Sequence, residues 1–334
     1  MYSRFPRSLN AKRITQVDVQ VPPFDFGPPN SVCEYQEGLF ILREKEAGNR
    51  NGITGFPCSL PLPMDSLSDW FQPFDSCVVA FSGGLDSSVV AKAAALTLGE
   101  AAEAVMAYSA SSLCSEVDAA RTVAEAIPIR FQAFPSFEMD DEAYVANDRE
   151  RCYHCKKIRF AALCRYAVER GRQIVVDGSH ADDLNDYRPG RRAVLEFGVR
   201  SPLLELGLTK VQVRELARFW KLPNSEKPAA PCLSTRLAYG LRITEERLRQ
   251  VEAAEEYLRN WGFSPFRVRL HTDDLARIEV APDQLSRLAE PDLRATIVEK
   301  FQRLGFRFVS VDLQGFRSGS MDGRMGNGEL RVKS

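Results

Sequence analysis

The segment Ser82-Gly83-Gly84-Leu85-Asp86-Ser87 has the residue types that bind a phosphate chain. Its adjacent glycines let the backbone approach phosphate oxygens without a Cβ clash, and its serines, with the following Ser88, can donate hydroxyl hydrogen bonds. The Asp86 carboxylate could reach the Mg²⁺ that accompanies a pyrophosphate group. The segment lacks the Gly-Lys-Ser/Thr ending of the loops that serve cleavage of the γ-phosphate. It therefore predicts a phosphate-binding loop of another kind.

An apolar run at 77–81 precedes this segment, and a helical pattern at 87–98 follows it. A strand, a glycine turn and a helix start together bring backbone N–H groups onto an anion. In this context the hexapeptide resembles the Ser-Gly-Gly-x-Asp-Ser signature of the PP-loop ATP pyrophosphatases, which adenylate a substrate and release pyrophosphate. The resemblance implies ATP and Mg²⁺ as ligands, and AMP and pyrophosphate as products. The plainer alternative is a glycine turn whose serines cap a helix.

Cysteines are the second candidate for chemistry, and the chain has eight of them, at 33, 58, 77, 114, 152, 155, 164 and 232. These are few for a disulfide framework in 334 residues, so metal binding or catalysis is the better interpretation. The Cys152-x-x-Cys155 pair is expected on one side of a turn, before a helix that begins near Lys156. Taken alone, the pair favours zinc or plain thiols over iron–sulfur, and a zinc site could use Cys152, His154, Cys155 and Cys232.

Longer segments resemble one subfamily of the PP-loop enzymes. They are ERCYHCKKIRF (150–160), VDGSHADDLNDYRPGRRA (176–193), RSPLLELGLTKVQVREL (200–216), EKPAAPCLSTRLAYG (226–240), FRVRLH with ARIEV, and DLQGFRSGSM (312–321). They are similar to the ATP-dependent sacrificial sulfur transferases, the LarE family, over roughly 66–321. The resemblance implies that pyridinium-3,5-biscarboxylic acid mononucleotide is the substrate and that its carboxylates become thiocarboxylates of the nickel-pincer nucleotide. Adenylation suits this reaction, because a free carboxylate resists a sulfur nucleophile whereas an acyl-AMP carries a good leaving group.

The same resemblance implies how sulfur is supplied. Family members in which the cysteine of the PCL segment stands alone give up its sulfur, whereas members with three cysteines hold a [4Fe-4S] cluster that carries an extra sulfide. Cys152, Cys155 and Cys232 match the three-cysteine pattern. We therefore expect a cluster held by these thiols, with an open iron for sulfide from a donor. Zinc remains the alternative metal.

Acidic and basic residues complete the candidate site. Asp182, Asp183 and Asp186 follow a predicted strand end, where ligands collect in open α/β sheets, and Asp183 is expected to share Mg²⁺ with Asp86. A solvated acidic turn is the alternative. The arginines that could bind ATP or substrate phosphate are Arg188, Arg200 and Arg236.

Arg267 and Arg269 alternate along a predicted strand and would share one face. Similar arginines in the family bind the phosphate of the substrate nucleotide, and the resemblance extends more weakly to Glu255 and Arg317. A solvent-facing strand edge is the alternative for each arginine.

The elements that must position these residues indicate two domains after an irregular start. Pro clusters and a Gly/Asn turn predict an N-terminal extension at 1–65. Apolar strands then alternate with helices, which predicts an α/β PP-loop domain at 66–240, with a parallel sheet wrapped by helices as in adenine nucleotide alpha hydrolases. After a Pro-rich link at 222–233, the pattern predicts a smaller α+β domain at 241–334, for substrate binding or oligomerisation. A helix capped by Thr244 should open that domain. The family often forms homo-oligomers.

Composition limits the partners. Lys and Arg total 44 against 45 Asp and Glu, which gives a net charge of −1 and no general field for a polyanion. A PP-loop tRNA thiolase, the nearest rival enzyme, would need a basic RNA-binding region, and a non-catalytic nucleotide-binding module would not need an intact loop. We expect no membrane segment and a cytoplasmic location, although the basic residues 1–13 leave a transit peptide as an alternative.

Overall fold

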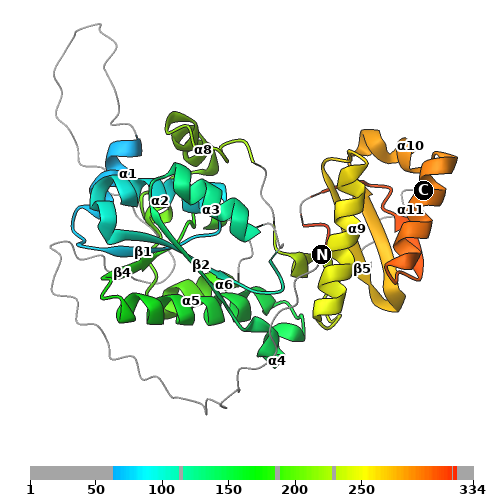
Figure 1. The fold of residues 1–334 in the computed structure, drawn as a ribbon, viewed down its shortest axis with the longest axis horizontal. Coiled ribbons are helices and arrows are strands. Elements are labelled where there is room, and N and C mark those ends of the chain that lie inside the picture. The colour runs from blue at the N-terminus through cyan, green and yellow to red at the C-terminus, as the bar shows by residue number, and fades with distance from the viewer. Residues whose placement is uncertain (1–62, 113–115, 185–188, 228–230, 318, 322–334) are drawn as a thin grey trace, which may run out of the picture. The chain divides into compact units, whose positions relative to one another are not determined.

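The computed structural model describes residues 63–112, 116–184, 189–227, 231–317 and 319–321, which form two sheets with their helices (Figure 1). The predicted extension at 1–65 lies outside the described residues except for its last three. Within the described ranges, no helix combines the length and apolar character needed to cross a bilayer.

The first sheet is parallel throughout. Its strands are β1 (Cys77–Ala80), β2 (Ala102–Tyr108), β3 (Arg130–Pro135) and β4 (Ile174–Val176), in the order β3-β2-β1-β4. The helices α2 (Leu85–Leu98), α3 (Glu116–Ala126) and α5 (Arg151–Glu169) connect successive strands. This arrangement confirms the predicted α/β fold, in which apolar runs become parallel strands covered on both faces.

Side chains of the strands alternate between the two faces, as the pleat requires. Val79 and Val176 point into a core with α2, α3, α1 (Pro63–Phe71) and α8 (Lys210–Phe219). Val78 and Val175 point into the other core, with α5 and α6 (Gly190–Glu196). Figure 1 shows α2, α3 and α8 above the sheet and α5 and α6 below it. The short helix α7 (Pro202–Glu205) adds Leu203 to the first core, whereas Tyr144 and Val145 of α4 (Glu142–Val145) pack into the core of the second sheet.

Helix α5 corrects one prediction. It begins at Arg151, not near Lys156, so Cys152 and Cys155 lie in its first turns instead of in a turn before it. Residues three apart on a helix share one face, so both sulfurs still lie on the same side. Helix α8 begins at Lys210, where Thr209 and Gln212 form a capping box with the backbone.

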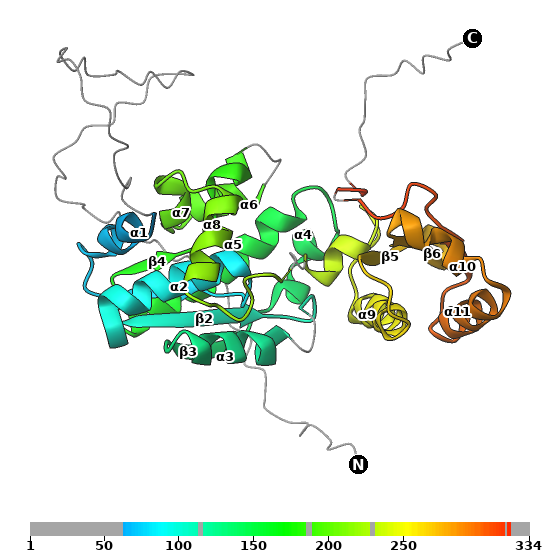
Figure 2. The same cartoon turned by 90° about the horizontal axis from the view of Figure 1, so that it is seen from above.

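The second sheet is smaller and mixed. It consists of β5 (Phe266–His271), β6 (Leu275–Val280) and β7 (Phe308–Val311), with β5 antiparallel and β7 parallel to β6. Three helices accompany it: α9 (Glu245–Asn260), α10 (Leu285–Leu288) and α11 (Pro291–Arg303), seen from above in Figure 2. Thr244 caps α9 by accepting a hydrogen bond from the Arg247 amide, as predicted. These elements confirm the α+β region, and the boundary at 240 stays a prediction.

Candidate functional site

The loop between β1 and α2 is folded by its own side chains. Gly83 has a φ of +67°, and a Cβ there would lie 2.7 Å from the Cα of Ala120, so only glycine fits. The Ser82 hydroxyl accepts from the Gly84 amide at 3.2 Å, and the Ser87 hydroxyl accepts from the Ser82 amide at 3.2 Å. No side chain caps α2 at Gly84. The first amides of this helix are therefore available to an anion.

Asn224 supports this loop from behind, although the sequence analysis did not identify it. Its side-chain amide is buried and donates to the Gly83 carbonyl and to the Ser88 hydroxyl, both at 2.9 Å. Ser88 donates in turn to the Gly84 carbonyl at 2.8 Å. The structure thus places Ser88 behind the loop, where it holds the backbone in shape.

Lys210 is a second residue that the sequence analysis missed. It is the first residue of α8, and its ammonium group donates to the Asp86 carboxylate, at 2.6 Å from Oδ2. Its backbone amide donates to Asp182 Oδ2 at 2.7 Å. A cation beside Asp86 adds positive charge where pyrophosphate would lie, and it ties α8 to the phosphate loop.

The loop after β4 presses against the phosphate loop. A Cβ on Gly178 would lie 2.7 Å from the amide nitrogen of Ser87, so glycine is required at this approach. The neighbouring Asp177 accepts from the Ser201 hydroxyl at 2.7 Å, and Asp183 is buried and accepts from the His180 amide at 3.1 Å. Asp186 and Arg188 lie outside the described residues.

One cavity of about 390 Å³ collects eight of the predicted site residues. Its lining includes Ser82, Gly84, Asp86, Ser87 and Asp183 together with Cys152, Cys155 and Cys232. The structure therefore brings the phosphate loop, two candidate Mg²⁺ ligands and three thiols to one space. It does not bring Arg200 there: that side chain pairs with Glu205 at 2.8 Å and lies over the Trp70 ring at 5.1 Å.

Cys152 and Cys155 are placed as neutral thiols. Burial raises the pKa of Cys155 to about 12 against the opposing charge of Arg159, and burial also raises the pKa of Cys152. Among the described residues, no set of three or more His, Cys, Asp or Glu side chains is spaced to hold a metal ion. By donor chemistry, three thiols on one cavity fit a soft metal or an iron–sulfur cluster. His154, the fourth ligand of the zinc alternative, packs against the Tyr153 ring.

A buried ion pair lies behind Cys155. The Arg159 guanidinium donates to the Glu138 carboxylate, which also accepts from the Ser136 hydroxyl at 2.8 Å. The Cys155 sulfur lies 3.8 Å from the same carboxylate. Arg159 is therefore a fixed cation beside the thiols, and its own charge is already compensated.

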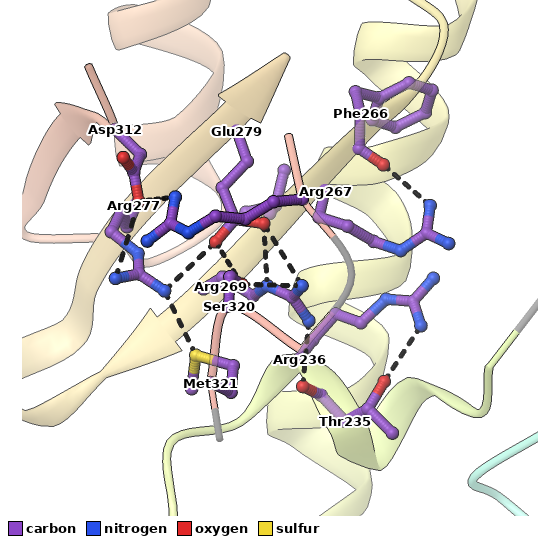
Figure 3. Close-up of polar contacts among 12 residues, drawn as sticks. Thr235, Arg236, Phe266, Arg267, Arg269, Arg277, Glu279, Asp312, Ser320 and Met321 are labelled. Atoms are coloured by element: carbon purple, nitrogen blue, oxygen red, sulfur yellow. Dashed lines mark hydrogen bonds and ion pairs between the residues drawn. The ribbon is translucent and has the colours of Figure 1, made fainter. Parts of the chain in front are cut away.

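Four of the predicted phosphate-binding arginines form a separate cluster beside the second sheet: Arg267 and Arg269 on β5, Arg236 in the turn at 233–236, and Arg317 after β7. Figure 3 shows Arg236, Arg267 and Arg269. Most of them already have carboxylate partners: Arg236 with Glu255 at 2.9 Å, Arg269 with Glu279 at 3.1 Å, and Arg317 with Asp312 at 3.1 Å. Arg277, which the sequence analysis did not select, also pairs with Glu279 at 3.0 Å.

Arg267 differs from its neighbours. Within the described residues it donates only to the Phe266 carbonyl, at 2.7 Å, and lies over the Phe316 ring at 5.2 Å. Burial, reinforced by the charge of Arg236, lowers the pKa of Arg267 to about 10. Arg267 is therefore the member of the cluster with the greatest need for an anionic ligand.

Comparisons with known proteins agree with this architecture. Residues 69–185 match the family model described as NAD synthase. The chain is 38% identical over 253 residues to the pyridinium-3,5-bisthiocarboxylic acid mononucleotide synthase of Lactiplantibacillus plantarum, covering 75% of this chain and 91% of the relative. It is 41% identical over 259 residues to an uncharacterized protein of Synechocystis sp., covering 78% and 96%. An uncharacterized protein of Methanocaldococcus jannaschii is 32% identical over 241 residues, covering 72% and 90%.

Proposed function

Because this chain belongs to the LarE family of PP-loop enzymes, which includes the Lactiplantibacillus plantarum synthase, we propose that it converts carboxylates of pyridinium-3,5-biscarboxylic acid mononucleotide into thiocarboxylates. It is an enzyme of the ATP pyrophosphatase type. The observation that carries the proposal is the single cavity lined by both the phosphate loop and the three thiols. Activation by ATP and delivery of sulfur can take place in one space.

The first step is adenylation of a carboxylate. The glycine-turn amides and the hydroxyls of Ser82 and Ser87 bind the β- and γ-phosphates, and Asp86 and Asp183 would hold Mg²⁺. A carboxylate oxygen attacks the α-phosphorus, the bond from that phosphorus to the bridging oxygen breaks, and pyrophosphate leaves with the electron pair. Lys210, beside Asp86, stabilises the negative charge that develops on pyrophosphate.

The second step replaces AMP by sulfur at the acyl carbon. Cys152, Cys155 and Cys232 would hold the [4Fe-4S] cluster, which when bound supplies a site for the sulfide that is transferred. The chain's own contribution is to keep these thiols on the same cavity as the acyl-AMP and to keep Arg159 beside them. Water must be excluded from this cavity, since it would hydrolyse the acyl-AMP.

The arginine cluster is the proposed site for the phosphate of the substrate nucleotide. Arg267 supports this assignment, because it is the cluster member without a carboxylate partner among the described residues. Arg236 and Arg269, held by Glu255 and Glu279, would contribute the remaining positive potential.

The test is a product analysis on anaerobically purified, reconstituted protein with the mononucleotide, ATP, Mg²⁺ and sulfide. We expect AMP and pyrophosphate together with a product whose mass shows exchange of oxygen for sulfur. Measured iron and zinc contents distinguish the cluster from the zinc alternative. Release of ADP only, or no AMP with any carboxylate, would contradict the proposal.

A further inference from the structure

Arg151 is a buried cation whose described partners include no carboxylate. Among the described residues, three arginines are less than a tenth exposed: Arg151 at 4%, Arg236 at 3% and Arg269 at 6%. Arg236 pairs with Glu255 and Arg269 with Glu279. No described carboxylate pairs with Arg151. Burying an ion is costly unless an opposite charge compensates it, so this side chain differs physically from the other two.

The contacts of Arg151 orient its guanidinium but do not compensate its positive charge. Nη1 donates to the Asn147 side-chain oxygen and, at 2.9 Å, to the Ser234 carbonyl. The guanidinium lies over the Tyr239 ring, 5.3 Å from the ring centroid. Nε is buried and has no hydrogen-bond partner. The guanidinium also forms a side-chain hydrogen bond with the Cys152 thiol. All these partners are uncharged, so the positive charge of Arg151 has no counter-ion among the described residues and awaits an anion.

The position of Arg151 indicates which anion this is. It lines the same cavity as Asp86, Ser87 and Cys232. It immediately precedes Cys152, and its bond to Ser234 anchors the segment two residues beyond Cys232. An anion bound here would lie between the loop that activates with ATP and the thiols that deliver sulfur.

We propose that Arg151 binds the carboxylate that is to be adenylated and so places it between the phosphate loop and Cys232. The planar guanidinium fork matches a carboxylate in geometry and charge, whereas the phosphates of ATP already have the glycine-turn amides, Lys210 and Mg²⁺. This assignment rests on the proposed function and adds to it the residue that selects acids. Neutral amides of the same shape would be rejected, because they leave the buried charge unpaired.

The experiment compares two mononucleotides that differ only in carboxylate versus carboxamide. Nicotinic acid mononucleotide and nicotinamide mononucleotide are titrated calorimetrically into the full chain without ATP. We expect the wild type to bind the acid at least about tenfold more tightly than the amide, because only the carboxylate can accept two charge-assisted hydrogen bonds from the guanidinium. Arg151→Lys keeps the positive charge but loses the planar pair of donors, so it should reduce the preference for the acid over the amide. Arg151→Met should abolish that preference.

Three controls separate the competing explanations. ATP binding should be unchanged in Arg151→Met; weaker ATP binding with an intact acid preference would assign the residue to the nucleotide phosphates and overturn the proposal. A lower melting temperature with an intact acid preference would leave Arg151 as a structural clamp and also overturn it. Arg172→Lys, at an arginine paired with Glu103, is the matched variant and should keep the wild-type preference.

Failure of the inference can be told apart from failure of the proposed function. If the wild type forms AMP from the biscarboxylate and Arg151→Met does so with the same KM, only the role of Arg151 is wrong. If the wild type forms no AMP from any acid, the function itself is wrong. If the wild type binds the acid and the amide equally tightly, Arg151 does not select the carboxylate, and no variant is needed to show it.

Discussion

The two ends of the parallel sheet differ in whether protein groups of opposite charge pair with a buried charge. Near the amino end of β2, Glu103 is fully buried and accepts hydrogen bonds from Arg130 at 3.0 Å, from Tyr166 at 3.0 Å and from Arg172. At the carboxyl ends of the strands, Arg151 has no carboxylate partner among the described residues, and burial raises the pKa of Cys155 to about 12. The first end is saturated by protein groups, whereas the second is left to be completed by ligands.

This difference separates stability from function within one sheet. A saturated network lowers the free energy of the folded chain and gains nothing from a ligand. Incompletely paired groups destabilise the empty site and are compensated when substrate binds. Substitutions at the amino end should therefore change stability without changing substrate binding, and substitutions at the carboxyl end should do the reverse.

The largest expected effect is at Cys232. Cys232→Ala should reduce thiocarboxylate formation about 1,000-fold or more while AMP and pyrophosphate are still formed, because adenylation does not use this thiol. Liquid chromatography with mass spectrometry measures both products. Cys164→Ala is the matched control, since Cys164 faces the Phe197 carbonyl on the covered side of the sheet. If Cys232→Ala forms thiocarboxylate at the wild-type rate, Cys232 does not supply the sulfur at the carboxyl ends of the strands.

Asp86→Asn should lower AMP formation about 100-fold, because the carboxylate is needed for Mg²⁺ and for the position of Lys210. The measurement is pyrophosphate exchange at saturating ATP and Mg²⁺. The exposed Asp118→Asn provides a control carboxylate in α3. If Asp86→Asn exchanges pyrophosphate at the wild-type rate, the Mg²⁺ assignment fails.

Glu103→Gln tests the saturated end. We expect it to lower the free energy of unfolding by about 2 kcal/mol, since charged hydrogen bonds are lost in a buried site, and to leave the KM for ATP unchanged. Denaturant titration and steady-state kinetics measure the two quantities. A raised KM with unaltered stability would mean that Glu103 serves ATP binding and not folding.

The pH dependence of the same variant sharpens the test. Burial alone would raise the pKa of Glu103, but the hydrogen bonds from Arg172, Tyr166 and Arg130 outweigh it and hold the pKa below its ordinary value. The stabilisation is therefore present above the unfolded-state pKa of about 4.3 and is lost as the pH falls through the folded-state value. The stability difference between wild type and Glu103→Gln should stay constant near neutral pH and shrink under acid conditions.

The smallest expected effect is at Asn224. Asn224→Ala should raise the KM for ATP several-fold, corresponding to about 1 kcal/mol, because the Gly83 carbonyl and the Ser88 hydroxyl lose their shared donor. Kinetics at varied ATP concentrations measure it. No change in the KM would mean that the loop keeps its shape without this support.

Much of the fold could be predicted from the sequence because it depends on local pattern. The apolar runs predict the parallel strands, and the cap at Thr244 predicts the start of α9. The start of α5 was predicted too late. Residues 151–155 carry no capping signal and form a Cys-x-x-Cys pair, which indicates a turn, yet their backbone continues the helix.

The site could be predicted only in part, for a physical reason. Phosphate-loop residues act within a few positions of one another, so their spacing is visible in the sequence. Lys210 meets Asp86 across 124 positions and Asn224 meets Gly83 across 141, and only the folded chain brings them together. The sequence could not single out Arg151 either, because only the folded chain shows that no described carboxylate lies beside it.

The close approach of Gly178 to the amide of Ser87 has a consequence for exchanging parts between enzymes. The nucleotide cradle is formed by two stretches of chain some 90 positions apart that interlock without a side chain between them. Transplanting residues 82–88 into another scaffold would therefore fail unless the host also offers a bare backbone at the matching place. The unit that can be transferred as one module consists of the loop at 82–88 together with the segment around Gly178. The loop alone is only half of that unit.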